Sequence, residues 1–342
     1  MLIVRRPVRR LLVALLPLLA LAAAACSDPM TTTDPQSDFA DTVHGVYQIV
    51  TILAAIVFVA VLALTLILAI VFHERPGRRA QQFHGNSKLE VVWTIIPVAI
   101  VTVIAIPTFR AIADTTDPAP DDAITIAVTG HQWWFEFEYE GTGLVTANEI
   151  HIPAGRATSF LLRSDDVIHS FWVPQLAGKV DLIPGHENEL WFTPHENAAR
   201  PEPYLGQCAE FCGLSHANMR FRVYVDTPQN FSAWIEAQQA SRIAPANEAT
   251  AAGETLFLSS SCVGCHTVKG TAAAGSIGPD LSHIGSRSTI ASGIMDNDRE
   301  SLIRWISNPD REKPGVVLMP AFESQMTQEQ IASIADYLLS LQ

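Results

Sequence analysis

The chain has 342 residues, enough for two ordinary domains plus membrane segments, and a formal net charge of −13 at pH 7. Such acidity argues against nucleic acid as a partner and favours a basic protein surface. The five cysteines are an odd number and do not suggest a disulfide framework. Four of them form two close pairs, each followed by a histidine, as metal or haem ligation requires.

The N-terminus has the pattern of an export signal. Four arginines within residues 5–10 precede the apolar run 11–25, which is short for a membrane span and ends in small residues. Residues 1–26 are therefore interpreted as a signal peptide. The run Ala23-Ala24-Ala25-Cys26 resembles a bacterial lipobox, in which Cys26 is lipidated after cleavage. The alternative for this cysteine is a free thiol in an uncleaved anchor.

Two apolar runs predict a transmembrane hairpin within residues 40–113. Residues 46–72 exceed the roughly 20 residues that a helix needs to cross a bilayer. The second run, residues 91–112, contains Pro97 and Pro107. Proline in a spanning helix frees backbone carbonyl groups that neighbouring helices must satisfy, so this helix is expected to pack against protein.

The loop between the two runs sets the expected orientation. It carries four basic residues, Arg75, Arg78, Arg79 and Lys88. The positive-inside rule places such a loop in the cytoplasm. Everything after Asp114 is then expected on the outer face of the bacterial cytoplasmic membrane, in agreement with an N-terminal export signal.

Residues 115–230 predict an all-β sandwich or barrel. Short runs of alternating apolar residues are separated by turn residues such as Gly141 and Gly155. A stretch rich in soft metal ligands, residues 207–219, stands before the last run, Arg220–Val225. This stretch is expected on a loop at one end of the sandwich, where functional sites are often built.

Several metal sites are compatible with this stretch. Its strong ligands recur at every fourth residue, and one methionine and one upstream histidine complete the set: Cys208, Cys212, His216, Met219 and His169. Two cysteines and two histidines suit a structural zinc, and in an oxidising compartment the cysteines would alternatively form a disulfide. The methionine counts against zinc. Two thiolates can instead bridge two copper ions, which share one electron and need little reorganisation on electron transfer.

These features together resemble the CuA domain of cytochrome c oxidase subunit II. The resemblance covers about residues 40–228 and is carried by four segments: Cys-x-Glu-x-Cys-x-x-x-His-x-x-Met at 208–219, Asp-Val-x-His-Ser at 166–170, the aromatic segment 130–139 and the hairpin sequence 89–97. It implies a cupredoxin fold for residues 115–230. It also implies binuclear copper held by six donors: the bridging thiolates of Cys208 and Cys212, the imidazoles of His169 and His216, the thioether of Met219 and the backbone carbonyl of Glu210.

The same resemblance implies roles for three further side chains. The Glu210 carboxylate would bind Mg²⁺ at the interface with subunit I, or else be a solvated loop carboxylate. Trp133 would be the tryptophan through which electrons enter above the copper, although an aromatic residue in a strand is otherwise simple packing. Glu90 would open the proton path into subunit I, although the helix dipole also favours an acid at a helix N-terminus.

Residues 231–247 predict a short helix and linker, and residues 248–342 predict a second exported domain. That domain contains Cys262-Val263-Gly264-Cys265-His266, the attachment motif of c-type haem. In this motif the two thiols add to the haem vinyl groups and the histidine binds the iron. The motif alone would also suit a zinc half-site or a redox pair, but export favours haem c.

A methionine is the expected ligand on the other side of the haem iron. Residues 308–320 resemble the distal loop of class I cytochromes c, which implies Met319, with Met295 and Met326 as the alternatives. A segment around Pro279 resembles the proximal loop, which implies that its carbonyl accepts a hydrogen bond from the haem histidine. Histidine and methionine together give a relatively high potential, suited to passing electrons rather than binding oxygen.

The whole chain resembles subunit II of a caa3-type oxidase. The expected fold class is multi-domain: a two-helix transmembrane hairpin, an all-β cupredoxin-like sandwich and an all-α class I cytochrome c domain. The last domain is expected to end in an amphipathic helix capped by Thr327. A hinge at residues 243–247 would let the haem domain swing or dock.

The resemblance implies an electron path that begins at an external donor, either a cytochrome c or a cytochrome bc-type complex. Electrons would pass through haem c and CuA to subunit I, where O₂ is reduced and protons are translocated. The implied partners are subunits I and III and membrane lipid. Two alternatives remain. A membrane-anchored copper and haem carrier for another terminal reductase would not need Glu90 or Glu210, and a copper-binding assembly factor would not need the haem motif.

Overall fold

The computed structural model describes residues 29–74, 76–77, 84–240 and 244–342. The chain divides into two compact units. One comprises residues 39–118, and the other joins residues 119–342 to the segment that ends at Asp38. The expected signal peptide, including Cys26, lies outside the described residues, as do three of the four basic residues on which the predicted orientation rests, Arg75, Arg78 and Arg79.

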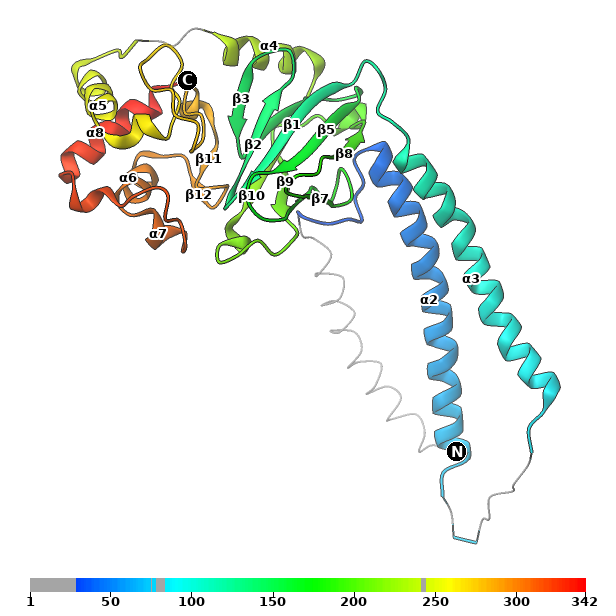
Figure 1. The fold of residues 1–342 in the computed structure, drawn as a ribbon. Helices are drawn as coiled ribbons and strands as arrows, with labels where there is room; N and C mark the ends of the chain where they lie inside the picture. Colours follow the sequence, from blue (N-terminus) through cyan, green and yellow to red (C-terminus); the bar gives the residue numbers. More distant parts are fainter. Residues whose placement is uncertain (1–28, 75, 78–83, 241–243) are drawn as a thin grey trace, which may run out of the picture. The chain divides into compact units, whose positions relative to one another are not determined.

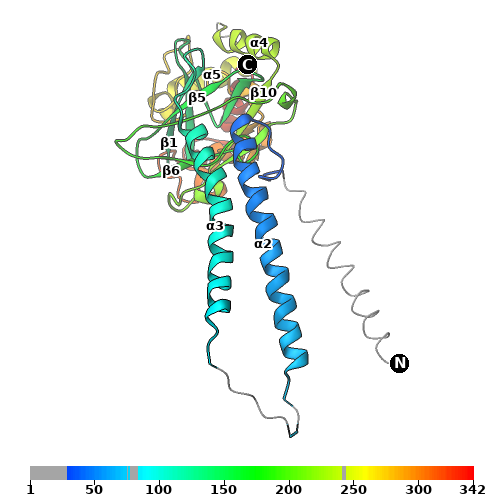
Figure 2. The same cartoon turned by 90° about the vertical axis from the view of Figure 1, so that its right-hand side faces the viewer.

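Residues 39–118 form a helical hairpin, with α2 (Asp38–Val71) and α3 (Ser87–Thr116) side by side (Figures 1 and 2). Both helices are long and apolar enough to cross a membrane. α2 begins before the apolar run expected at 46–72 and ends one residue short of it, whereas α3 extends past both ends of the run expected at 91–112. The start of α3 is set by a cap, because the Asn86 side chain accepts from the amides of Lys88 and Leu89. Pro97 and Pro107 lie inside a continuous α3.

The expected β-sandwich is confirmed and consists of two five-stranded sheets (Figure 1). The first has the order β3 (Leu144–Ala147), β2 (Trp134–Tyr139), β1 (Ile124–His131), β5 (Thr158–Ser164) and β8 (Asn188–Phe192). The second has the order β4 (Glu149–Pro153), β10 (Arg220–Asp226), β9 (Tyr204–Cys208), β6 (His169–Trp172) and β7 (Val180–Leu182). Phenylalanines from both sheets meet between them, with the ring centres of Phe135 in β2 and Phe221 in β10 4.9 Å apart.

The register of the second sheet positions the ligand-rich loop. β9 ends at Cys208 and β10 begins at Arg220, so the loop joins two antiparallel neighbours at one end of the sheet. β6 runs antiparallel to β9 and pairs Phe171 with Cys208. The first residue of β6, His169, therefore lies at the same end of the sheet as the loop.

The helix after the sandwich, α4 (Pro228–Gln239), begins before the segment 231–247 in which it was expected. Proline suits the first helical position, and the Thr227 side chain caps the helix by accepting from the Asn230 amide. Trp234 of α4 stacks on His151 of β4, with the ring centres 4.3 Å apart. Part of the expected hinge, residues 244–247, is described, whereas Ile243 is not.

The C-terminal domain is built on α5 (Glu248–Ser259), α6 (Arg299–Ser307), α7 (Pro309–Glu312) and α8 (Gln328–Leu339). α5 crosses α8 closely at Gly253. A Cβ at this position would lie 2.0 Å from the Ser333 carbonyl oxygen, so only glycine allows this approach. Thr327 caps α8 as expected. The domain is not purely α-helical, since it also contains a small hairpin of β11 (Thr289–Ile290) and β12 (Met295–Asp296).

Short 3₁₀ turns complete both domains. They are η1 (Glu196–Ala198), η2 (His216–Asn218), η3 (Ser261–Gly264), η4 (Ile284–Ser286) and η5 (Phe322–Ser324). Two of them carry expected ligands, because η2 contains a histidine of the metal-ligand loop and η3 contains the first cysteine of the haem motif.

Candidate metal and haem sites

The sulfur and imidazole ligands expected from the sequence converge at the end of the second sheet. The Cys208 and Cys212 sulfur atoms are 3.7 Å apart. The Cys208 sulfur lies 3.9 Å from Nδ1 of His169, and the Cys212 sulfur lies 3.6 Å from Nδ1 of His216. The Met219 sulfur is 3.9 Å from that of Cys212. All the expected side-chain donors therefore belong to one cluster.

The cluster is elongated. His169, Cys208 and Cys212 offer ligand atoms within 4.8 Å of one another, and all three side chains are buried. His216 stands outside this triad and approaches from the Cys212 side. A pair of central thiols with one imidazole at each end is the arrangement that two bridged ions require. Both cysteines are free, so the disulfide alternative is wrong for this structure.

The two thiols are electrostatically unequal. Hydrogen bonding from Cys212 and then from His169 outweighs burial and lowers the pKa of Cys208 to about 3. The same sulfur–sulfur contact, reinforced by burial, raises the pKa of Cys212. Their contact thus favours loss of the first proton from Cys208 and retention of the second on Cys212. A metal ion must displace the remaining proton, because the thiolate is the ligand form.

Asp166 orients the upstream histidine. Its carboxylate is 2.8 Å from Nε2 of His169 and accepts a hydrogen bond from the backbone amide of Gln132 at 2.6 Å. With Nε2 engaged, Nδ1 faces the sulfur of Cys208, as in many metal sites where a carboxylate holds the second nitrogen of a ligating histidine. Gly130 provides the space for the ring, since a Cβ there would lie 2.7 Å from Cδ2 of His169. The sequence carried a signal for this partner, an acid three residues before the histidine, but its role was not predicted.

Trp133 is hydrogen-bonded to the ligand loop. Its indole Nε1 donates to the Cys212 carbonyl oxygen at 3.0 Å, and the side chain of Gln132 donates to the same oxygen at 2.7 Å. The Trp133 side chain is largely buried. It is therefore more than a packing residue, because it contacts the backbone of an expected copper ligand.

Glu210 has one group at the cluster and another in solvent. Its backbone carbonyl oxygen lies 3.2 Å from the Cys208 sulfur, next to the donor cluster. Its carboxylate is 43% exposed and lies 4.0 Å from Nζ of Lys179. In the other unit, Glu90 is exposed in the first turn of α3, where the helix dipole favours an acid.

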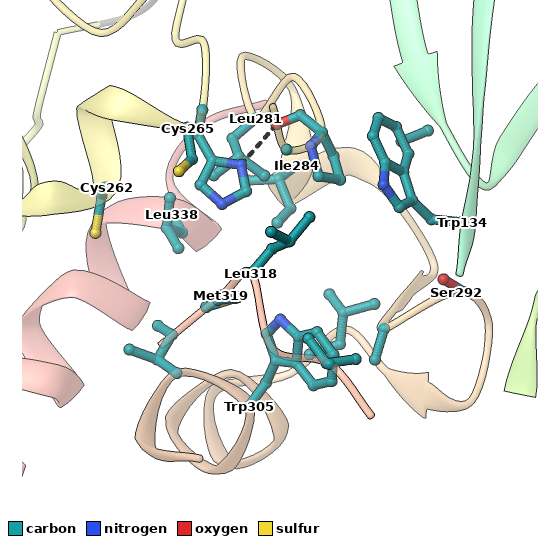
Figure 3. Close-up of a pocket in the computed structure, with 18 of the residues that line it drawn as sticks. Trp134, Cys262, Cys265, Leu281, Ile284, Ser292, Trp305, Leu318, Met319 and Leu338 are labelled. Carbon is teal, nitrogen blue, oxygen red and sulfur yellow. Dashed lines mark hydrogen bonds between the residues drawn. The ribbon is translucent and has the colours of Figure 1, made fainter. Parts of the chain in front are cut away.

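The second expected site is a cavity of about 390 Å³ that is lined mainly by the C-terminal domain and also by residues 132–134, 147 and 148 of the sandwich domain. Figure 3 shows Cys262, Cys265 and Met319 on its wall among apolar side chains. His266 also lines it and donates through Nδ1 to the Pro279 carbonyl oxygen at 2.8 Å, as the resemblance to cytochromes c implied. This bond leaves Nε2 free to bind iron. The fit to a covalently attached haem is good, because both thiols, one imidazole and one thioether surround a single apolar space.

Burial keeps His266 in the neutral form that binds metal, and the backbone at Gly278 packs closely against its ring. Burial lowers its pKa, which favours the neutral imidazole that metal binding requires. A Cβ on Gly278 would lie 2.7 Å from the ring, so glycine is needed there. Met319 and Met326 both pack against the hydrophobic core and Met295 belongs to it, but of these three candidate axial methionines it is Met319 that lines the cavity.

Three protein families match successive parts of the chain. Residues 29–111 match "Cytochrome C oxidase subunit II, transmembrane domain", and residues 142–225 match "Cytochrome C oxidase subunit II, periplasmic domain". Residues 250–342 match "Cytochrome c". These matches follow the order hairpin, sandwich and helical domain seen in the structure.

Several known proteins are similar to most of the chain. Cytochrome c oxidase subunit 2 of Alkalihalophilus pseudofirmus is 37% identical over 91% of this chain and 91% of its own length. The protein of that name from Bacillus sp. strain PS3 is 32% identical over 96% of this chain and 97% of its own. A crystal structure of the periplasmic domain of subunit II from Bradyrhizobium japonicum is 29% identical, covers 36% of this chain and 97% of its own, and has a TM-score of 0.33.

Proposed function

Because this chain belongs to the cytochrome c oxidase subunit II family and carries a fused cytochrome c domain, we propose that the two sites described above are its electron-transfer centres. The chain is the electron-transfer subunit of an oxidase complex and does not itself contain the oxygen-reducing site. The observation that carries the residue assignment is the elongated donor cluster on the sandwich, with its two central thiols.

The copper ligands are proposed to be those brought together at the end of the second sheet: His169, Cys208, Glu210 through its carbonyl, Cys212, His216 and Met219. Binuclear copper would supply a centre that spreads one electron over two ions. The protein's own contribution is to keep the ligands rigid. Strand pairing and Asp166 hold the upstream histidine, and burial keeps water away from the sulfur atoms.

The haem ligands are proposed to be His266 and Met319, with Cys262 and Cys265 as the attachment thiols and Pro279 as the hydrogen-bond acceptor behind the histidine. Bound haem c would supply a one-electron carrier of relatively high potential. The apolar walls of the cavity support this proposal, because exclusion of water favours the neutral form of the site over a charged one.

Trp133 is proposed to lead electrons to the copper centre, which is supported by its hydrogen bond to the Cys212 carbonyl. The exposed Glu210 carboxylate is proposed to bind Mg²⁺ at the contact with subunit I. Glu90 is proposed to open the proton path of that subunit. The expected domain division also stands as a proposal, with the copper domain at 115–230 and the haem domain at 248–342.

The proposed setting is the bacterial cytoplasmic membrane. The hairpin anchors the chain there, both cofactor domains lie on the outer face, and residues 1–26 are removed as a signal peptide. Subunits I and III are the proposed stable partners, and a cytochrome c or a cytochrome bc-type complex is the proposed donor. A copper-binding assembly factor fits less well, because it would not need the haem cavity.

Purification of the native membrane complex tests the proposal. We expect two copper ions and one covalent haem per chain, a mixed-valence copper signal, and co-purification of a haem–copper subunit I. One zinc ion and no copper would falsify the assignment of the metal cluster. Purification of the chain without a haem–copper partner would instead identify a free electron carrier.

A further inference from the structure

We propose that the β11–β12 hairpin of the haem domain is a docking clamp, which binds Glu149 and the Trp133 backbone of the copper domain and holds the haem domain over that tryptophan. Both domains lie within the compact unit that contains residues 119–342. The consequence for electron transfer rests on the proposed function. The docking itself does not, because protein groups alone make it.

Glu149 is the first contact of the clamp. This carboxylate begins β4, the edge strand of the second sheet, and is 5% exposed. It accepts four hydrogen bonds from two residues of the haem domain. Ser288 donates through its amide at 3.0 Å and its hydroxyl at 2.9 Å, and Thr289 donates through its amide at 2.8 Å and its hydroxyl at 2.9 Å. A buried carboxylate needs such donors, and here the other domain supplies them.

The neighbouring strand extends this contact. β10 pairs with β4 so that Arg222 lies beside Glu149. Arg222 donates a hydrogen bond to the Thr289 hydroxyl at 3.3 Å, and the Tyr224 hydroxyl donates one to the Ser288 hydroxyl at 2.9 Å. Alternate residues of β10 face the core, so these two side chains belong to the outward face of the sheet. The haem domain therefore covers a face that would otherwise be in water.

The tip of the hairpin makes the second contact. Ser292 is 3% exposed, its hydroxyl donates to the Trp133 carbonyl oxygen at 2.7 Å, and its own carbonyl accepts from the Arg220 amide at 3.1 Å. Ala291 and Ser292 both have left-handed backbones, with φ of 53° and 62°. Such left-handed residues suit the tight turn of a hairpin, and this turn brings Ser292 to Trp133.

A loop of the haem domain closes over the tryptophan. Nζ of the buried Lys313 donates to the Trp133 carbonyl oxygen at 2.5 Å and to the Ser292 hydroxyl at 2.7 Å. Next to it, the Pro314 carbonyl accepts from Ser215 of the copper domain. Gly315 lies so near the indole that a Cβ would be 2.7 Å from Cη2. This leaves Trp133 9% exposed.

The clamp has a functional consequence. Trp133 contacts the haem domain through its carbonyl and the copper-ligand loop through its indole N–H. An external donor cannot reach a tryptophan that is covered in this way, so it must reduce the haem domain instead. The haem domain is thus docked and does not swing between donor and copper. Glu149 is a positioning residue in this scheme, since it acts by holding Ser288 and Thr289.

The test is hydrogen–deuterium exchange on the full chain in detergent, read at the Arg220 amide. This amide belongs to the copper domain and donates to the Ser292 carbonyl of the haem domain, so its exchange reports separation of the domains. In Glu149→Ala we expect the Arg220 amide to exchange at least about tenfold faster than in the wild type, since four hydrogen bonds to a charged group are lost. Photoreduced haem should also pass its electron to copper at least tenfold more slowly, and the rate should become dependent on viscosity.

Two further variants complete the design. Ser288→Ala combined with Thr289→Ala removes two hydroxyl donors from the haem side and should act in the same direction, which covers the case in which Glu149→Ala does not fold. Glu189→Gln is the matched control, because Glu189 accepts from Ser159 within the copper domain. It should leave Arg220 exchange unchanged.

Unchanged exchange at Arg220 in both clamp variants would overturn the proposal. A chain that lacks copper or haem would instead count against the proposed function, and cofactor content is measured on the same samples. The two failures are therefore distinguishable.

Discussion

Gly130 offers the sharpest test of the copper-site geometry. Replacement by alanine adds one methyl group whose carbon would lie 2.7 Å from Cδ2 of His169 and 3.2 Å from Cδ2 of Leu182. Ordinary contact begins at 3.4 Å, so the imidazole must move by 3.4 − 2.7 = 0.7 Å or the strand must shift. The ring has little freedom, because it is fully buried and Asp166 holds its Nε2.

The cost of Gly130→Ala follows from this crowding. Overpacking of a close-packed interior typically costs about 1–3 kcal/mol of unfolding free energy. The displaced ring also changes its distance from Cys208. We therefore expect a lower melting temperature for the copper domain and an altered copper hyperfine pattern in electron paramagnetic resonance, with the haem spectrum unchanged.

The control for this experiment is Gly45→Ala in α2, where an added Cβ meets nothing within 4 Å. It should change neither property. If Gly130→Ala retained both the wild-type melting temperature and the wild-type copper signal, His169 would have room to spare. The argument that strand packing fixes this ligand would then be refuted.

Three further predictions concern the individual sites. Met319→Ala should lower the haem potential on the order of 0.1 V, a modest part of the roughly 0.8 V that axial ligands span, and should slow copper reduction; an unchanged haem spectrum would move the ligand to another methionine. The copper affinity of the metal-free chain should increase as pH rises through neutrality, because the raised pKa of Cys212 keeps a proton on its sulfur that copper must displace. Titration calorimetry in two buffers should show proton release on copper binding. Copper binding without proton release would contradict the assignment of both thiols as ligands. Glu90→Gln should slow turnover of the assembled oxidase while leaving copper reduction intact, and turnover equal to the wild type would remove the proton role.

Local patterns in the sequence predicted most of the site. The spacing of Cys208, Cys212, His216 and Met219 falls within one loop, so a short turn brings them together whatever the rest of the chain does. The same holds for the haem motif and for the capped start of α8. Hydropathy alone identified both apolar helices, although not their ends, since caps and not apolar content decide where a helix stops.

Other features required the tertiary structure. The distance between His169 and Cys208 depends on the pairing of β6 with β9, which joins residues far apart in the chain. The sequence identified neither Asp166 nor Gly130 as support for this histidine. Gly130 belongs to the first sheet and meets His169 of the second, so only the packing of the two sheets brings them together. Asp166 stands three residues before His169, but its bond to the Gln132 backbone amide also depends on the fold.

The amino-acid sequence by itself thus determined which chemical groups the two centres contain. Only the tertiary structure decided how the two domains meet. A sequence places Glu149 at the start of a strand, where a carboxylate is usually solvated, and leaves a haem domain free to swing or dock. The fold instead buries that carboxylate against Ser288 and Thr289, more than a hundred residues away. Burial and distant hydrogen-bond partners are properties of the packed chain, because water is displaced only when both surfaces are in place.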